Sequence, residues 1–296
     1  MRQLIEAIGF GIASGAVVSL GAVGFTVQFG ISNVLNITYG SLMTLAAFVG
    51  YGILQAGVNV WVVLAATSVL IGVASVAFNR LLLAPLSRRG TGFVAMVIVT
   101  VSAGIILQYL IVAVTGAAAR SYGQQSGATL HLGDIVLTES QIAIIGLTLV
   151  LMTGFHLLLT RTKLGRAMRA TSTNRTVARS CGIRTDRVID FTWLVSGLMC
   201  GAAGVALAIT TVSFDFSIGA TFLIYMIAAA VLGGIGQPYG AMIGGLVVGI
   251  ASQVAGAYWS PAYQPVVAFG ILIAMLLVRP RGLFSSGAAA ARRLAG

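Results

Sequence analysis

The sequence predicts an all-α polytopic membrane protein, and three observations support that fold class. Hydrophobic residues make up 58% of the chain, whereas charged residues make up only 8%. Apolar stretches with almost no charge recur from Leu4 to Val278, each close to the ~20 residues that a helix needs to cross a bilayer. The stretches are continuous and lack the period-two alternation of β-barrel strands, and the 38 glycines suit close packing of helices.

The apolar windows predict nine membrane spans within one transmembrane domain, residues 1–296. The spans cover residues 4–30, 37–55, 60–83, 93–115, 139–160, 188–211, 219–236, 239–257 and 263–279. The N-terminal sequence has no clear cleavage site, so we expect the first span to be retained. Polar residues in FGISNVLNITYGS interrupt the first apolar region, which predicts a broken or re-entrant helix near residues 30–41 and leaves eight crossings as the alternative.

The cations indicate which loops face the cytoplasm. Residues 161–187 contain eight Lys and Arg residues in a chain that is otherwise poor in charge. If this loop is cytoplasmic, alternation places all Lys and Arg residues except Arg2 and Arg120 inside, together with the C-terminus, as the positive-inside rule requires. This topology accounts for the net charge of +11, so we expect no nucleic-acid partner.

The basic loop at residues 161–187 also carries a helical pattern. Small or apolar side chains, among them Ala167, Met168 and Ala178, recur at rough helical spacing, and Gly182 follows as a helix C-cap would. We therefore expect a short amphipathic helix on the cytoplasmic face. Topology alone explains cations in this loop, but it does not explain the pattern.

Two external features have open interpretations. The segment at residues 117–138 is polar and contains short alternating stretches, so it forms either a small hairpin that docks an external partner or an ordinary solvated connection. Asp215 lies near the external end of a span, between Phe214 and Phe216. It is either a solvated loop carboxylate, or a contact for an external partner, or part of an entrance gate.

Cysteine and histidine do not predict a disulfide or a metal site. Cys181 falls in the cytoplasmic loop and Cys200 in a span, so we expect two unpaired thiols. His131 belongs to the external loop, whereas His156 lies near the cytoplasmic end of its span. The two imidazoles are therefore too far apart to share a metal ion.

Polar residues within the apolar regions predict the substrate path, because burying them in a bilayer is costly. The first group lies at the predicted break and consists of Asn33, Asn36, Thr38, Tyr39 and Gly40. Free backbone amides and a helix N-terminus at such a break suit a carboxylate or a polar amide. A helix–helix hydrogen-bond cluster without substrate contact is the alternative.

A glycine-rich turn is the second candidate for the substrate path. It contains Gly233, Gly234 and Gly236 and leads into YGAM at 239–242, which is similar to YGSL at 39–42 and hints at an internal repeat. Transporters often bind substrate at corresponding breaks of two repeats. Tight packing alone is the alternative role of these glycines.

Four segments, in order along the chain, resemble permeases of branched-chain amino acid ABC importers of the LIV type. They are NVLNITYGSLMTLAAFVGY, LGRAMRA with the later CGIRTDRVI, AAAVLGGIGQPYGAMIGGLVVG and VVAFGILIAMLLVRPRGLF. Together the segments extend over nearly the whole chain. Two departures stand out, because many relatives have His at the position of Tyr39, and acidic residues where this chain has Ser172, Thr173 and Asn174.

The resemblance implies that the basic loop carries a coupling helix, which sits in a groove of an ATPase subunit. The positions that match the family pattern are Gly165, Arg166, Ala167, Arg169, Ala170, Ala178, Gly182, Asp186 and Arg187. Small residues would let such a helix seat closely, and cations would pair with acidic groups or lipid phosphates.

The resemblance also implies the partners. The chain has no P-loop motif, so it is expected to be no enzyme, and ATP is hydrolysed by other subunits. Such importers combine two permease subunits, here with a paralogue as the second, two cytoplasmic ATPase subunits and an external substrate-binding protein. We expect this chain to contact membrane lipid in the bacterial plasma (inner) membrane and to bind no cofactor or metal, with ATP and Mg held by the ATPase subunits.

The implied substrate is a branched-chain or other hydrophobic amino acid. The same machinery could instead move urea, a short amide or another small polar solute. An ion-coupled secondary transporter is the alternative of a different class, and it would need carboxylates or histidines inside the membrane. The six acidic residues fall nearly all in loops or at membrane edges, which disfavours that class.

Overall fold

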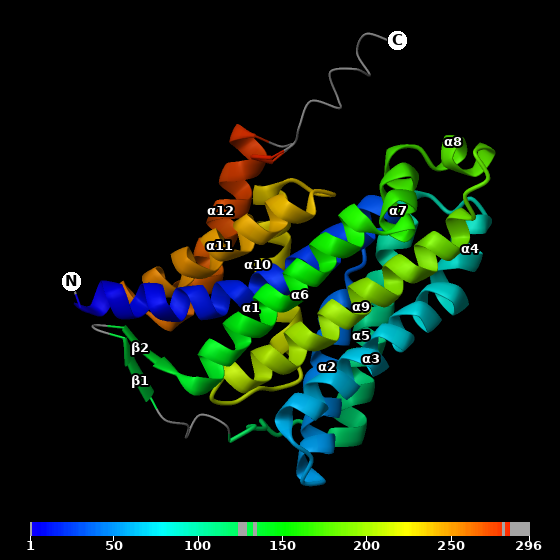
Figure 1. The fold of residues 1–296 in the computed structure, drawn as a ribbon. Helices are drawn as coiled ribbons and strands as arrows, with labels where there is room; N and C mark the ends of the chain where they lie inside the picture. The colour runs from blue at the N-terminus through cyan, green and yellow to red at the C-terminus, as the bar shows by residue number, and fades with distance from the viewer. Residues whose placement is uncertain (1, 124–128, 133–134, 280–281, 285–296) are drawn as a thin grey trace.

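The computed structural model describes residues 2–123, 129–132, 135–279 and 282–284 (Figure 1). The first half contains α1 (Arg2–Ser32), α2 (Thr38–Gln55), α3 (Val60–Phe78), the π-helix η1 (Asn79–Leu83), α4 (Ala84–Arg88) and α5 (Phe93–Thr115). Strands β1 (Thr129–Leu132) and β2 (Ile135–Thr138) follow. The second half contains α6 (Glu139–Arg161), α7 (Lys163–Thr173), α8 (Arg175–Ser180), α9 (Thr185–Thr210), α10 (Ile218–Gly233), α11 (Pro238–Tyr258), the 3-10 helix η3 (Pro261–Tyr263) and α12 (Gln264–Val278).

Each of the nine predicted spans coincides with a helix. Seven segments of the described chain are long and apolar enough to cross a membrane: Glu6–Ser32, Val60–Arg88, Phe93–Thr115, Glu139–Arg161, Thr185–Thr210, Pro238–Tyr258 and Pro261–Val278. Helix α10 is apolar but has 16 residues, and α2 is less apolar because it contains Thr38, Tyr39 and Gln55. The prediction of an all-α polytopic membrane protein is confirmed.

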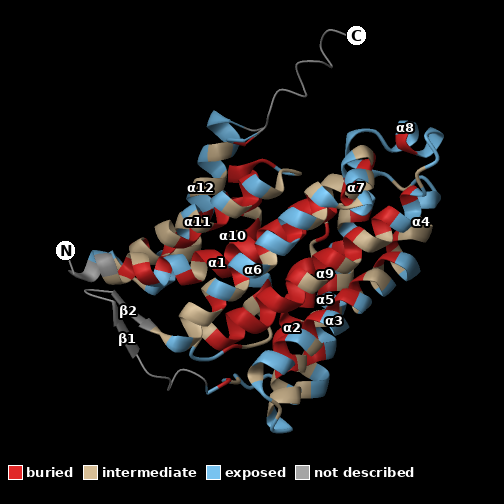
Figure 2. Ribbon diagram, viewed as in Figure 1, coloured by how far each residue is buried: buried red, intermediate tan, exposed pale blue. Residues whose placement is uncertain are grey.

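Helices α1 and α9 form the centre of the bundle. Their apolar windows are 78% and 89% buried, against 17% for α5 and 6% for α12. Figure 2 shows this contrast, and the closest neighbours are α11 for α1 and α3 for α9. The outer helices turn large apolar side chains such as Ile106 and Leu277 outward, as helices facing lipid or a second subunit do.

The beginning of α1 and the end of α12 lie at opposite ends of the bundle. Helix α1 contacts β2, and its beginning lies near the β-strands in Figure 1. After α12, the Leu283 amide donates a hydrogen bond to the Leu232 carbonyl at 2.9 Å, next to the α10–α11 turn. Gly236 in this turn borders the same cavity as Met168 on α7. The chain therefore crosses the bundle an odd number of times, which favours nine crossings over eight.

The predicted break in the first apolar region is present at residues 33–37, between α1 and α2. Asn33 begins it with a positive φ of 55°, a conformation that is uncommon outside glycine. Asn33 borders a cavity together with Thr171 and Ser172 of α7. The break therefore lies at the end of the bundle that carries α7.

The third span contains a distortion that was not predicted from the sequence. The π-helix η1 joins α3 to α4, and the Ala84 amide donates to the carbonyl of Asn79, five residues earlier. Pro85 comes next and has no amide hydrogen with which to continue the normal helical ladder. The side chains of Asn79 and Arg80, in this wide turn, both bond to α9.

The basic loop forms two short helices, so the prediction of one amphipathic helix is wrong in its extent. Asn174 interrupts the helix with an extended backbone, and its Oδ1 accepts hydrogen bonds from the amides of Thr176 and Val177. An Asn side chain is a favoured helix N-cap because it satisfies free amides in this way. Gly182 follows α8 with a φ of 82°, as predicted for a C-cap.

The segment at residues 117–138 contains the predicted hairpin. Strands β1 and β2 pair antiparallel, with Thr129 opposite Thr138 and Leu132 opposite Ile135. Thr138 also caps α6 through a capping box with Gln141, which joins the hairpin directly to the next span. Residues 124–128 and 133–134 of the predicted loop lie outside the described residues.

Candidate coupling surface and substrate path

Helix α7 presents two different faces. Gly165, Met168 and Thr171 are buried against the bundle, at the spacing of one helical face. Leu164 and Arg166 point away from it and are exposed. We call α7 and α8 together the basic platform, because five cations are exposed on them: Lys163, Arg166, Arg169, Arg175 and Arg179.

The first turn of α7 is fixed to the last turn of α6. A side chain at Gly165 would meet the carbonyl oxygens of Leu158 and Leu159, so only glycine allows this approach. The Gly165 amide donates to Thr162 Oγ1 at 2.9 Å, and Arg169 Nη1 donates to the Leu159 carbonyl at 2.6 Å. These contacts leave α7 little freedom to move independently of α6.

The small residues of the platform differ in position. Ala167 and Ala170 are half-buried at the edge of the inward face of α7. Ala178 is only 4% exposed and faces the protein, so its methyl group is not part of the outward surface. Val177, its neighbour, is 56% exposed. The exposed surface of the platform thus combines cations and hydroxyl side chains with two apolar residues, Leu164 and Val177.

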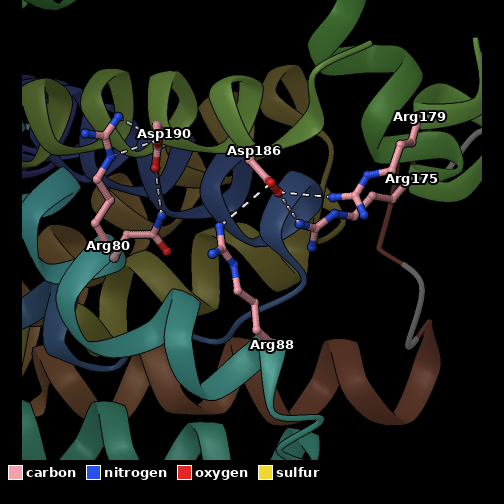
Figure 3. A network of polar contacts seen from close by, with 7 residues as sticks. Arg80, Arg88, Arg175, Arg179, Asp186 and Asp190 are labelled. Atoms are coloured by element: carbon pink, nitrogen blue, oxygen red, sulfur yellow. Dashed lines mark hydrogen bonds and ion pairs between the residues drawn. The ribbon is translucent and has the colours of Figure 1, made fainter. Parts of the chain in front are cut away.

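Asp186 in the first turn of α9 connects the platform to the rest of the bundle. Its Oδ1 lies 3.1 Å from Arg175 Nη2 and 3.2 Å from Arg179 Nη2, both on α8 (Figure 3). Its Oδ2 lies 3.9 Å from Arg88 Nη2, at the end of α4. One carboxylate therefore joins α8 and α9 to α4, which lies about 100 residues earlier in the chain.

Asp190 makes a second connection one turn further along α9. Its Oδ2 accepts hydrogen bonds from the Arg80 guanidinium at 2.8 and 2.9 Å, and its Oδ1 accepts one from Asn79 Nδ2 at 3.2 Å (Figure 3). Residues four apart lie on the same helix face, so Asp186 and Asp190 form one acidic edge. This edge holds the third span through η1 and the platform through α8.

The two connections differ in exposure. The Asp186 side chain is 55% exposed, and each of its arginine partners is at least 44% exposed, so water and salt weaken each pair. The Asp190 side chain is only 21% exposed. Two carboxylates do not neutralise the surrounding cations, and Arg166 and Arg187 are both exposed, so the surface remains positive.

The predicted path residues at the break divide into two groups. Asn33 is exposed at the platform end, whereas Asn36, Thr38, Tyr39 and Gly40 are buried among helices. Thr38 Oγ1 donates to the Thr100 carbonyl at 2.5 Å. A Cβ on Gly40 would lie 2.7 Å from the Gly219 carbonyl oxygen, so α2 and α10 meet closely there.

Two amide side chains near the break are buried with unused hydrogen-bonding groups. Both polar atoms of Asn36, which is 1% exposed, have no partner. Gln28 on α1 accepts from Ser196 Oγ at 3.0 Å, but its Nε2 has no partner. Tyr39 Oη also reaches this cluster, because it donates to the Ser196 carbonyl at 3.3 Å. A buried polar group without a partner needs an explanation, and a water molecule or a ligand can supply the missing hydrogen bond.

The predicted glycine turn joins α10 to α11 beneath the platform. Gly233 and Gly240 pack against each other without room for a side chain, and Gly234 and Gly236 have φ values of 103° and 88°. Gly236 also lines a cavity of about 270 Å³ with Met168 and residues of α1 and α6. The turn, the end of α1 and the platform thus meet at one place.

A separate cavity lies at the opposite end of the bundle, and sequence reasoning missed it. We call it the distal cavity; it has a volume of about 500 Å³. The first turn of α6, the end of α9 and the start of α10 border it, whereas α7 adjoins the last turn of α6. Asp215 was the one signal in the sequence, but Ser252 and Gln264 come from distant segments. Among the described residues, no three His, Cys, Asp or Glu side chains could together hold a metal ion.

Fold and site together define a class: a multi-pass α-helical membrane protein with a structured basic platform at one end and a polar cavity at the other. A family model described as "Branched-chain amino acid transport system / permease component" matches residues 7–276, and the chain belongs to this family. It is therefore a membrane subunit of a transport system and not an enzyme.

Curated relatives agree with the family match over most of the chain. The high-affinity branched-chain amino acid transport system permease protein BraD of Pseudomonas aeruginosa is 28% identical over 96% of this chain and 95% of its own. The protein LivH of Escherichia coli, with the same description, is 31% identical over 92% of both chains. The autoinducer 2 import system permease protein LsrC of Yersinia enterocolitica is 31% identical over only 43% of this chain and 38% of its own.

Proposed function

We propose that this chain forms the membrane path of an ATP-driven ABC importer for branched-chain and other hydrophobic amino acids. Residues 1–296 would act as one permease domain in the bacterial inner membrane, with the loop at 161–187 and the C-terminus in the cytoplasm. The observation that carries the proposal is the basic platform, which Asp186 joins to α4 and α9, while Asp190 joins α9 to η1. Such a surface can transmit movement from a cytoplasmic motor to several spans at once.

The nine coupling residues inferred from the resemblance have separate roles in this proposal. Arg166 and Arg187 are exposed and would contact an ATPase subunit. The others maintain the platform or border its contact surface, and they are Gly165, Ala167, Arg169, Ala170, Ala178, Gly182 and Asp186. Exposed Leu164 and Val177 would add apolar contact, since interfaces combine an apolar centre with a charged rim.

The substrate would leave the membrane past the break and the glycine turn. The unused polar atoms of Asn36 support the placement of this residue on the substrate path. Asn33, Thr38, Tyr39 and Gly40 would line the path with it. Gly233, Gly234 and Gly236 would let the turn bend, because it lies beside the platform. In this proposal, a movement of the platform shifts the inner end of the substrate path directly, because α7 and the glycine turn line the same cavity.

The proposed partners follow from the missing P-loop motif and from the exposed apolar surfaces of this chain. The sequence has no P-loop, so two ATPase subunits would bind ATP and Mg, and this chain would bind no cofactor or metal. A second permease subunit, a paralogue, and lipid would cover the apolar surfaces of α5 and α12. An external binding protein would deliver substrate at the end that carries the distal cavity and the hairpin of 117–138. Nucleic acid has no role in the proposal.

Two alternatives are less well supported. A small polar solute, such as urea or a short amide, is the first alternative; the autoinducer 2 permease LsrC, a relative named for another substrate, covers less than half of this chain. An ion-coupled secondary transporter would need free acidic groups inside the membrane. Asp186 and Asp190 are paired with arginines at the beginning of α9, and Asp215 lies in the loop between α9 and α10.

The test of the proposal uses a charge-reversed platform. Leu164→Glu combined with Arg166→Glu changes only exposed side chains, so the variant should insert and fold normally. We expect binding of the ATPase subunits and ATP-dependent leucine uptake to fall about tenfold or more, as loss of interface anchors does. Gln55→Glu is the control, because it adds a charge at an exposed position at the other end of the bundle. Full uptake by the double variant would contradict the proposal.

A further inference from the structure

The distal cavity combines polar and aromatic walls. Its volume of about 500 Å³ falls within the range of ~300–1,000 Å³ that is usual for ligand pockets. Phe10 on α1, Leu207 on α9 and Phe222 on α10 supply apolar surface. Hydroxyl and amide side chains from six helices and the α9–α10 loop complete the lining, among them Thr221 and Gln264. Such a cavity suits a small molecule with an apolar body and several polar groups.

Ser252 provides an independent sign of a ligand. Its side chain lines the cavity from α11 and is 3% exposed, and its Oγ has no hydrogen-bond partner. A serine in a membrane helix commonly bonds to a carbonyl of the preceding turn, as Ser68 does to Leu64 at 2.7 Å. The free hydroxyl of Ser252 is therefore available to a molecule in the cavity.

Asp215 is the charged group of the cavity wall. Its Oδ1 accepts hydrogen bonds from the Ser217 amide at 2.9 Å and the Ser217 hydroxyl at 2.8 Å, which orients the carboxylate. Within the described chain, both of these bonds end on Oδ1, so Oδ2 is open to a cation. The described lining contains no Lys, Arg or His to compete for it.

Amide groups complete the polar lining. Gln264 Nε2 on α12 donates a hydrogen bond to Gln253 Oε1 on α11 at 3.1 Å. Gln253 directly follows Ser252 in the sequence. Neutral amides and hydroxyls can bond to a carboxylate without the salt bridge that would hold it tightly. A transporter needs such moderate binding, because the substrate has to leave again.

From these features we infer that the distal cavity is the first substrate site in the membrane, where Asp215 binds the ammonium group of an amino acid and Ser252 hydrogen-bonds its polar end. The aliphatic side chain of the substrate contacts Phe10, Leu207 and Phe222. The inference rests on the proposed import function and adds a site to it. It also assigns Asp215 to the substrate rather than to the external binding protein.

The test measures protection of a cysteine in the cavity. Thr221→Cys supplies an exposed reporter, Cys181→Ser removes the exposed native thiol, and Cys200 is buried. The permease complex, with its ATPase subunits but without the binding protein, is placed in nanodiscs and labelled with N-ethylmaleimide. Leucine is compared with 3-methylbutylamine, which lacks the carboxylate, and with 4-methylpentanoate, which lacks the ammonium group.

We expect leucine and the amine to slow labelling, and 4-methylpentanoate to require about tenfold higher concentration, since bonds to charged groups are strong. Asp215→Asn should remove this difference between the ligands. Glu139→Gln, which neutralises an exposed carboxylate on α6 that does not line the cavity, should leave it unchanged. Equal protection by 4-methylpentanoate, or an Asp215→Asn variant that behaves like Glu139→Gln, would overturn the inference.

Uptake by the full complex with its binding protein separates this inference from the proposed function. If leucine uptake depends on ATP but leucine never protects the reporter, the cavity inference fails and the proposed function stands. If ATP-dependent uptake of leucine, isoleucine and valine is absent but the protection pattern appears, the import function fails and the amine site stands.

Discussion

The platform end and the distal end of the bundle have opposite chemistry. At the platform end, exposed arginines pair with two aspartates. At the distal end, hydroxyl, amide and aromatic side chains surround one aspartate. The first arrangement suits a protein surface that must be held firmly, and the second suits a small molecule that binds and leaves.

The two ends also differ in how their groups are held. Platform residues are fixed by bonds within the chain, such as Arg169 to Leu159 and Asp186 to Arg175. The wall of the distal cavity carries an unused hydroxyl at Ser252. A firmly held contact surface for a separate motor and a free binding group in a cavity are both features that a motor-driven transporter requires. The four predictions below test this contrast, beginning with the largest effect.

Gly165→Ala should have the largest effect. The added methyl group meets backbone oxygens of α6, including that of Leu159 at 2.5 Å, so α7 must shift. We expect a loss of about 1–3 kcal/mol of stability and a severe loss of uptake, because overpacking has no flexible neighbour to absorb it. Thermal unfolding and uptake are measured beside Gly154→Ala on α6, where no atom lies within 4 Å. Equal behaviour of the two variants would mean that α7 is not fixed to α6.

Asp190→Asn should lower the thermal midpoint more than Asp186→Asn. Asp190 is 21% exposed and Asp186 is 55% exposed, so solvent replaces the lost bonds more easily at Asp186. Midpoints of the two purified variants, measured in the same buffer, provide the comparison. The reverse order would show that the exposed connection to α8 is the stronger one.

Asp186→Asn should affect coupling more than stability. Without this carboxylate, Arg175 and Arg179 lose their shared partner and α8 is held less firmly. We expect substrate-stimulated ATPase activity to fall about threefold at low salt, and the gap from the unmodified complex to narrow at ~1 M salt, where charge pairs are screened. An effect that does not depend on salt would contradict an electrostatic role.

Ser252→Ala should have the smallest effect on stability. No bond is lost within the protein, whereas Ser68→Ala removes a bond to Leu64 and should cost about 0.5–1.5 kcal/mol. We expect the Ser252 variant to keep its thermal midpoint but to need several times more leucine to protect the Thr221→Cys reporter. A lower midpoint with unchanged protection would assign Ser252 to packing alone.

The sequence predicted the spans well because hydrophobicity and cation placement are local signals. All nine windows became helices, and the break and the hairpin appeared where they were expected. The single amphipathic helix was wrong because Asn174 caps a new helix, which depends on the orientation of one side chain. The η1 distortion had a signal in Pro85, but a proline alone does not say how a helix will adapt.

The candidate site was harder to predict, because its residues meet only in three dimensions. The family pattern included Asp186, yet nothing in the sequence paired it with Arg88, about 100 residues earlier. Ala178 matched the pattern as a small residue, but only the fold reveals that it faces inward. The distal cavity draws on α1, α6, α9, α10, α11 and α12, and no periodicity in one segment could indicate it.

The central claim is that the motor binds the basic platform while the substrate enters at the opposite end. The most direct measurement compares labelling rates of Val177→Cys on α8 and Thr221→Cys on α10, both at exposed positions, in one Cys181→Ser complex. We predict that adding the ATPase subunits slows labelling of Val177→Cys about tenfold, as burial in an interface does, and that leucine slows only Thr221→Cys. Unchanged labelling of Val177→Cys with the ATPase subunits bound, or protection of both cysteines by leucine, would contradict the account.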